Sequence, residues 1–125
     1  MKKLLALPAA LATFLVASHP AEAKPQNVVY AESYNYKFED EKDVSNCLNR
    51  ATVALTKNAL STGLRSHIDE DRRFGYVYGW SSDGTATAEI DCDMDENESN
   101  LVYARYSDDQ DATFELWKAI RDARW

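Results

Sequence analysis

The chain has 125 residues, with 21 acidic side chains against 14 basic ones and a formal net charge of −7. A protein that binds nucleic acid needs a basic stripe that neutralises phosphates and releases counterions. Beyond the first few residues the only adjacent basic pair is Arg72 and Arg73, and three acids at 69–71 directly precede it. We therefore exclude nucleic acids and anionic membrane surfaces as partners.

The first 23 residues have the three-part pattern of a secretory signal peptide. Two lysines precede an apolar run at 4–17, and the small-residue tripeptide 21–23 follows it. The run is shorter than the roughly 20 apolar residues that span a bilayer, so we expect no stable membrane insertion after cleavage. Removal of 1–23, which carries two lysines and one glutamate, leaves one domain at 24–125 with a formal charge of −8. The sequence thus predicts a bacterial protein that is periplasmic or secreted.

The chain contains two cysteines, Cys47 and Cys92. In a protein addressed to an oxidising compartment, two thiols without a competing third are expected to form a disulfide. The bridge would close a long loop and restrict the unfolded chain, which stabilises the folded state by about 4 kcal/mol in the loop-entropy model. We expect the disulfide to be necessary for folding.

The first half of the domain predicts a strand followed by a helix. Residues 28–38 are rich in β-branched and aromatic side chains, which is typical of a strand. The following apolar residues lie three and four apart and predict one stripe of a helix. That stripe comprises Val44, Cys47, Leu48, Ala51, Ala54, Leu55 and Ala59. Asp40 and Asp43 can cap its start, and Gly63 suits a left-handed residue at its end, after which 66–73 reads as a charged loop.

Two alternating segments at 74–80 and 85–94 predict a hairpin around the sequence SSDG. Its register decides which face carries Phe74, Tyr76, Tyr78 and Trp80, because a slip of one residue moves every side chain to the other side. A three-residue loop at 82–84 pairs these aromatics with the small side of the second strand, Trp80 with Ala86 and Phe74 with Cys92. A two-residue turn at 83–84 aligns them instead with Glu89, Asp91 and Asp93 on the outer side. We favour the first register because it buries large side chains beside small ones.

The remaining residues predict a strand at 101–107 and a helix that opens at Ser107 or Asp108. The apolar stripe of that helix comprises Ala112, Leu116, Ala119, Ile120 and Ala123, flanked by Phe114 and Trp117. The order is strand, helix, three strands, helix. We therefore predict an α+β domain with two layers, an antiparallel four-stranded sheet with two helices on one face, and one disulfide between a helix and a strand.

The acidic stretch 90–100 raises the question of a calcium site. Cys92 must face the helix that carries Cys47, because a disulfide needs its Cα atoms within about 7 Å. Asp91 and Asp93 then point away from the helix by the ordinary alternation of a strand. A calcium loop starting at Asp91 would need glycine where Glu96 stands and glutamate where Val102 stands, so the EF-hand pattern fails. Weak candidates for an irregular site remain, namely Asp93, Asp95, Glu96 and Glu98.

The sequence offers no catalytic constellation. His67 and Asp69 could form an oriented base, but no nucleophile-elbow glycine pattern accompanies them. One domain histidine and two disulfide-bonded cysteines cannot build a tetrahedral zinc site. A pair of catalytic carboxylates can neither be excluded nor identified among so many acids. We expect a non-enzymatic protein without a metal or cofactor.

Tyrosine and tryptophan are more numerous than one face of a small sheet buries comfortably. They contribute a large contact area at low entropic cost in recognition surfaces. The candidate interaction surface comprises Tyr30, Tyr34, Tyr36, Tyr76, Tyr78 and Trp80. We expect a small exported envelope protein that acts as a binding or protein-interaction module, with a small ligand or a cationic protein as its partner. The alternatives are an acidic inhibitor of a cationic cell-wall hydrolase or protease, and a weak calcium-binding protein.

Overall fold

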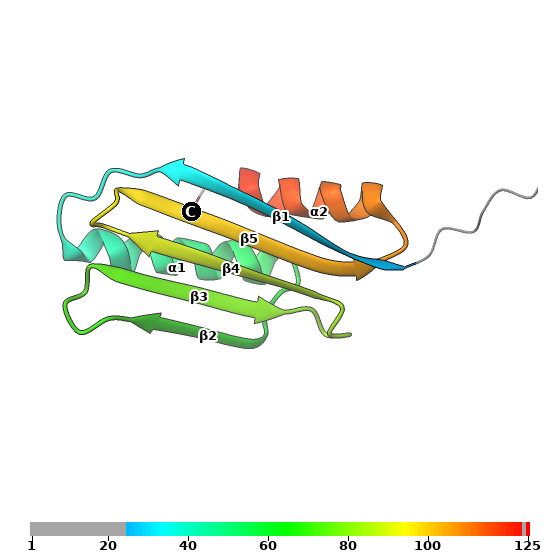
Figure 1. Cartoon of the computed structure of the whole chain (residues 1–125). Helices are drawn as coiled ribbons and strands as arrows, with labels where there is room; N and C mark the ends of the chain where they lie inside the picture. Colours follow the sequence, from blue (N-terminus) through cyan, green and yellow to red (C-terminus); the bar gives the residue numbers. More distant parts are fainter. Residues whose placement is uncertain (1–24, 124) are drawn as a thin grey trace, which may run out of the picture.

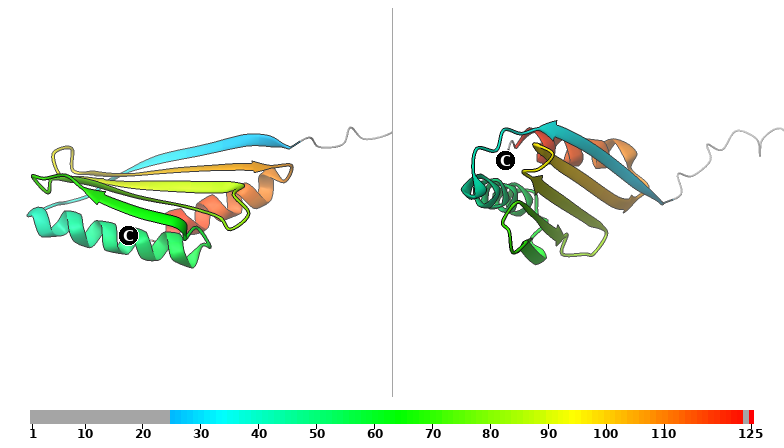
Figure 2. Two further views of the ribbon diagram at one scale, coloured as in Figure 1. Left: turned by 90° about the horizontal axis from the view of Figure 1, so that it is seen from below. Right: turned by 60° about the vertical axis from the view of Figure 1, so that its left-hand side comes forward.

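The computed structural model describes residues 25–123 and 125. The expected signal peptide at 1–23 lies outside them. The elements follow in the order β1 (Gln26–Asn35), α1 (Glu41–Lys57), β2 (Thr62–Ile68), β3 (Phe74–Trp80), β4 (Ala86–Asp93), β5 (Glu98–Ser107) and α2 (Gln110–Asp122). Figure 1 shows the sheet in front of α1, and the left view of Figure 2 shows both helices on the same side of the sheet.

The fold is α+β, with one antiparallel sheet, two helices and the expected disulfide, as the sequence predicted. The strand order across the sheet is β1-β5-β4-β3-β2. The sheet has five strands where four were predicted, because β2 occupies the residues read as the end of the helix and the first part of the charged loop. Six of the seven residues of β2 are exposed and only Leu64 is partly buried. An edge strand of this kind carries no alternating apolar signal, and its pairing with β3 defines it.

Helix α1 has the start that the sequence predicted and a different end. Asp40 accepts from the amide of Lys42 at 2.8 Å, and Asp43 accepts from the amide of Asp40 at 3.2 Å, which together form a capping box. At the other end Ala59 adopts the left-handed conformation with φ of 59°, and the amide of Leu60 donates to the carbonyl of Leu55. This Schellman ending replaces the cap predicted at Gly63, which lies in β2.

The disulfide joins Cys47 of α1 to Cys92 of β4, with their Cα atoms 6.3 Å apart. Both cysteines are fully buried in the core between the helix and the sheet. Ile90 is buried on the same side of β4, whereas Asp91 and Asp93 face the other side, as the sequence predicted. The core therefore lies under β3, β4 and β5 and against the apolar stripe of α1.

The hairpin adopts the register that we did not favour. Phe74 pairs with Asp93, Tyr76 with Asp91, Tyr78 with Glu89, and Trp80 with Thr87. The amide of Ser81 donates to the carbonyl of Ala86, so the connection is 82–85 with Gly84 left-handed. The aromatics consequently lie on the face that points away from both helices.

Close packing against the inner side of β3, by α1 and by the backbone between α1 and β3, explains this register. A Cβ atom at Gly75 would lie 2.5 Å from Leu48 Cδ1 and 2.7 Å from the carbonyl oxygen of His67, and one at Gly79 would overlap the backbone carbonyl of Leu60. Only glycine fits at these two positions, so rings cannot occupy this side of β3. The sequence prediction considered side-chain volumes only, whereas backbone carbonyls fill the space beside Gly75 and Gly79.

Helix α2 presents a different face from the predicted one. Its buried residues are Thr113, Trp117 and Ile120, whereas Leu116 is 38% exposed and Ala119 and Ala123 are also exposed. Trp117 stacks on Tyr30 of β1 with ring centroids 5.2 Å apart. The large indole, which the sequence analysis placed beside the stripe, turns the helix so that it covers the β1 side of the sheet.

Candidate functional site

The face of the sheet that points away from α1 and α2, here called the outer face, carries an aromatic row on β3. Its members are Phe74, Tyr76, Tyr78 and Trp80, which alternate with the buried Gly75, Val77 and Gly79. The Tyr76 and Tyr78 rings stack at 6.2 Å, and Trp80 is 44% exposed. The sheet pleat presents these rings as a continuous strip along one strand.

A row of carboxylates on β4 runs beside the aromatic row. Asp93, Asp91 and Glu89 stand directly opposite Phe74, Tyr76 and Tyr78. Burial, followed by the neighbouring carboxylates of Glu89 and Asp93, raises the pKa of Asp91 to about 6. One Asp91 oxygen, Oδ1, is buried without a hydrogen-bond partner. The charged form of this side chain is therefore poorly compensated in the free protein.

The other flank of the aromatic row carries the basic residues of β2. Arg65 pairs with Tyr78 and His67 pairs with Tyr76, so both side chains lie on the outer face. His67 Nε2 lies 3.0 Å from Asp69 Oδ1, and both side chains are about half exposed. The pairing of His67 with Asp69 that the sequence suggested is present, and it lies on an exposed edge strand.

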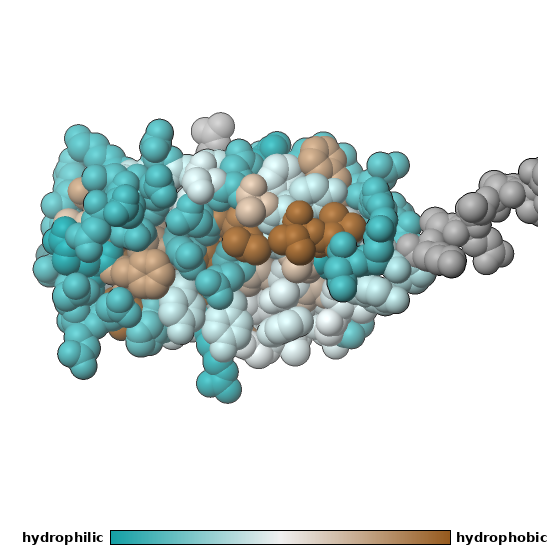
Figure 3. All heavy atoms as spheres, in the orientation of Figure 1, coloured by the Kyte–Doolittle hydropathy of each residue, from teal (hydrophilic) through white to brown (hydrophobic). Residues whose placement is uncertain are grey.

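An apolar patch on β1 and β5 completes the outer face. Val29 is 62% exposed and Val102 is 45% exposed, and they lie next to Ala104 and Ala31 in the ladder between the two strands. Figure 3 shows apolar residues gathered over β1 and β5, beside the paler region of β3 and β4. The outer face therefore offers aromatic, acidic and apolar contacts, with Arg65 and His67 at its β2 edge.

The six residues of the predicted interaction surface do not form one surface. Tyr76, Tyr78 and Trp80 lie on the outer face, whereas Tyr30, Tyr34 and Tyr36 lie on the helix side and pack against the core. Tyr30 contacts Trp117, Tyr34 meets Trp125 edge-on at 5.5 Å, and Tyr36 packs on Phe38. The first three tyrosines and the three aromatics of β3 therefore lie on opposite sides of the sheet.

The acidic turn after β4 does not bring its carboxylates together. Asp95 forms an ion pair with Arg73 at 2.5 Å, and Asp93 Oδ1 accepts from the amides of Asp95 and Glu96 at 3.0 and 3.2 Å. Across 25–123 and 125, no three His, Cys, Asp or Glu side chains are grouped so that they could hold a metal ion. Local hydrogen bonding and strand geometry therefore account for the positions of the weak calcium candidates, Glu98 included.

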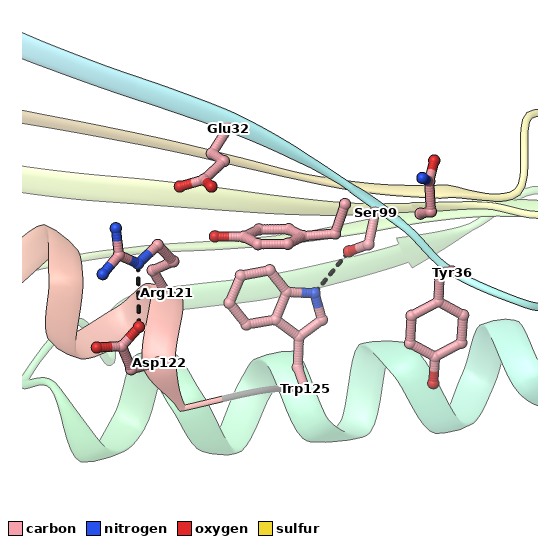
Figure 4. A pocket seen from close by; sticks show the side chains of 8 residues that line it. Glu32, Tyr36, Ser99, Arg121, Asp122 and Trp125 are labelled. Carbon is pink, nitrogen blue, oxygen red and sulfur yellow. Dashed lines mark hydrogen bonds and ion pairs between the residues drawn. The ribbon is translucent and has the colours of Figure 1, made fainter.

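A cavity of about 450 Å³ lies on the helix side, between β1 and the end of α2. Its lining comprises Glu32, Tyr34, Asn35, Tyr36, Ser99, Arg121, Asp122 and Trp125. Figure 4 shows Glu32 reaching into it from the sheet and Arg121 from the helix. A volume of this size is typical of small-molecule sites. The cavity was not predicted from the sequence. Its one signal is the alternation along β1, which places Glu32 on the same side of the strand as Tyr30 and Tyr34.

Trp125 forms one wall of this cavity and is anchored to the sheet. Its indole Nε1 donates to Ser99 Oγ at 2.5 Å, and Ser99 Oγ donates to the carbonyl of Asp91 at 2.8 Å. Ser99 is completely buried and Trp125 is 8% exposed. The cavity wall is therefore held by β5 and, through Ser99, by the backbone of β4.

Comparison of the chain with protein-family models and with curated proteins gives no match. The assignment of function consequently rests on the geometry of the chain itself. Within the described ranges, neither helix has the length and apolar character needed to cross a membrane.

Proposed function

We propose that the protein is an exported, non-enzymatic interaction module that binds a cationic protein segment on its outer face. The observation that carries this proposal is the pairing of Tyr76 with Asp91 and of Tyr78 with Glu89 on the face opposite the helices. Rows of aromatic rings and carboxylates side by side match the two preferences of a lysine or arginine side chain. The chain's net charge of −7 supports attraction of such a partner.

The energetics of the outer face favour a cation over a neutral group. An aromatic ring attracts a nearby ammonium or guanidinium by about 0.5–2 kcal/mol, depending on how far the pair is desolvated. Asp91 is already partly desolvated beside Glu89 and Asp93, so a positive charge from a bound segment compensates these neighbouring carboxylates. The free-energy cost of removing this carboxylate from water therefore falls mainly on folding, and binding adds little to it.

The apolar patch supplies the contact area that exposed charges alone do not provide. Exposed ion pairs contribute little to affinity because water and salt screen them. Val29 and Val102 add apolar surface next to the charged rows, and Trp80 adds a large ring at the end of β3. A segment with basic residues on one side and apolar residues on the other fits this arrangement best.

Titration calorimetry with two matched peptides tests the proposal. One peptide alternates lysine with valine, and the other carries acetyl-lysine at the same positions. We expect the first peptide to bind. Glu89→Gln and Trp80→Ser should each weaken its binding several-fold, by up to about tenfold. The control variants Glu115→Gln and Val53→Ser, on exposed positions of α2 and α1, should bind normally. Equal binding of the acetylated peptide, or equal loss in the controls, would contradict the proposal.

An acidic inhibitor of a cationic cell-wall hydrolase or protease is the second candidate, and the carboxylate row on β4 favours it. A bound inhibitor would present this row to a basic surface near the enzyme's cleft. Assays of a basic lysozyme and of basic proteases with excess protein test this candidate, with Glu89→Gln as the matched variant. Unchanged enzyme activity in every assay eliminates it and leaves the interaction module.

A further inference from the structure

The cavity beside α2 is separate from the outer face, because Glu32 and Tyr34 extend from β1 toward the helices. It combines three aromatic residues with five polar or charged ones. Tyr34 and Trp125 meet edge-on, and Tyr36 also lines the cavity. Concave sites in which aromatic side chains stand beside converging polar groups are common among small-ligand sites.

Two polar atoms in this cavity lack the contacts that buried groups require. Glu32 Oε2 and the Tyr34 hydroxyl are buried, and neither makes a well-aligned hydrogen bond in the structure. Most buried polar atoms in proteins are well paired, so a ligand or solvent that bonds to these groups improves on the free protein. Burial, and next the hydrogen-bonding interaction with the Glu32 side chain, raises the pKa of Tyr34 to about 12, so the hydroxyl keeps its proton at neutral pH.

The charges of the lining select the ligand. Arg121 Nε donates to Asp122 Oδ1 at 3.0 Å, and its guanidinium lies over the Trp117 ring at 4.9 Å, so this cation is already engaged by protein groups. Asp122 is neutralised by the same pair. Glu32 lies close enough to attract Arg121 but forms no ion pair with a described residue, so Glu32 and Asp122 against Arg121 leave one net negative charge in the lining. A cation with hydrogen-bond donors compensates this charge and bonds to the carboxylate.

We propose that this cavity binds a small primary ammonium ligand, with the ammonium group donating to the Glu32 carboxylate and its alkyl chain packed against Tyr34 and Trp125. An anion would meet the Glu32 carboxylate and is disfavoured. A neutral alcohol could donate one hydrogen bond, but it would bring no positive charge to the lining. A quaternary ammonium has the charge but no N–H group that can donate to the carboxylate.

Binding can be observed at a single atom of the cavity. The chain has three tryptophans, and only the Trp125 indole lines this cavity. Nitrogen-15 spectra of the folded full-length chain separate the three indole signals, so Trp80 and Trp117 serve as internal references. The probes are n-butylammonium, 1-butanol and tetramethylammonium at equal concentrations.

We expect n-butylammonium to shift the Trp125 indole signal with a Kd in the millimolar range, because so small a ligand makes few contacts. Glu32→Gln should weaken binding about tenfold, and Tyr34→Phe should weaken it less. The matched control Glu70→Gln removes an exposed carboxylate from the loop between β2 and β3 and should leave binding unchanged. The folding of each variant is verified from the same spectra.

Three results would overturn the proposal: no saturable shift with n-butylammonium, equal binding of 1-butanol or tetramethylammonium, or undiminished binding in Glu32→Gln. The proposed function is tested separately, since its peptides act on the outer face. A shift of Trp80 without a shift of Trp125 on addition of the amine would assign the amine to the outer face and also reject the cavity as its site.

Discussion

Tyr76 and Asp91 stand directly opposite each other in the ladder between β3 and β4, with both side chains on the outer face. Asp91 also pairs with Asn100 of β5, and Glu89 and Asp93 are its neighbours on the same side of β4. The pairing places a partly desolvated acid in the middle of the sheet, where a partner's cation can reach it.

The first prediction concerns stability and Asp91. Burial raises its pKa in the folded protein to about 6, above the ordinary aspartate value of 3.8. Protonated Asp91 therefore favours the folded state at low pH, and that contribution is lost as the pH rises from about 4 through about 6. For a fully buried group this pKa difference would correspond to about 3 kcal/mol in the free energy of unfolding. Because Asp91 is partly exposed, we expect a contribution of about 1 kcal/mol.

Asp91→Asn should consequently raise the free energy of unfolding at pH 7 by about 1 kcal/mol and have little effect at pH 4. Urea denaturation at both pH values measures this difference. The control is Asp93→Ala, which removes an acceptor of two backbone amides and should destabilise the protein at pH 7. Destabilisation by Asp91→Asn at pH 7 would contradict the raised pKa of Asp91.

The second prediction concerns the pH dependence of binding on the outer face. As the pH falls from 7 to 5, Asp91 takes up a proton and loses the charge that attracts a cationic segment, so affinity for the lysine peptide should fall several-fold. The groups that face Asp91 are Glu89, Asp93, Tyr76 and Asn100. Calorimetry is best performed in a His67→Gln background, so that no imidazole lies on the outer face beside Tyr76.

In Asp91→Asn the affinity should be lower at pH 7 and nearly independent of pH in this interval. A pH dependence that persists unchanged in this variant would show that another group of the outer face is responsible. The acetyl-lysine peptide provides the baseline at each pH.

The third prediction concerns the disulfide. Cys47 and Cys92 are separated by 45 residues in sequence. Replacing both with alanine should lower the free energy of unfolding by about 4 kcal/mol in the loop-entropy model, a large part of the 5–15 kcal/mol typical of a domain. Thermal and chemical denaturation of the oxidised protein and of the double variant measure this loss. Equal stability of the two would refute it.

The fourth prediction concerns the cavity carboxylate. Glu32→Gln replaces a partly buried charge that has a free oxygen with a neutral group of the same shape. The free energy of unfolding at pH 7 should therefore stay equal or rise by up to about 1 kcal/mol, while amine binding weakens. Urea denaturation measures the change, and Glu115→Gln on the exposed side of α2 should change stability by only a few tenths of a kcal/mol. A large destabilisation by Glu32→Gln would indicate that the carboxylate has a structural partner.

The sequence predicted the orientation of β4 because a covalent constraint fixes it. Cys47 lies on the stripe of α1, so Cys92 had to face the helix and Asp91 had to face away, as observed. The cap at Asp40 was predictable for a similar reason, since its hydrogen bonds are local in sequence. Both inferences depend on few residues and on no long-range packing.

The features that the sequence did not reveal depend on how backbones pack against each other. The outward position of Tyr76 and Tyr78 follows from the approach of Leu60 to Gly79, which no side-chain pattern records. Strand β2 exists through its pairing with β3, and its exposed side chains give no periodic signal. The cavity is formed by Glu32 and Arg121 from opposite ends of the chain, and their proximity requires the full topology.

Strand β3 carries its four aromatic side chains on one side of the sheet. Gly75 and Gly79 leave its inner side almost bare, so the interior depends there on main-chain contacts and on Val77 alone. The four outward positions can therefore be exchanged without repacking the interior. A library that varies 74, 76, 78 and 80 would sample many binding specificities at nearly constant stability, which makes this small oxidised sheet a scaffold for engineered recognition.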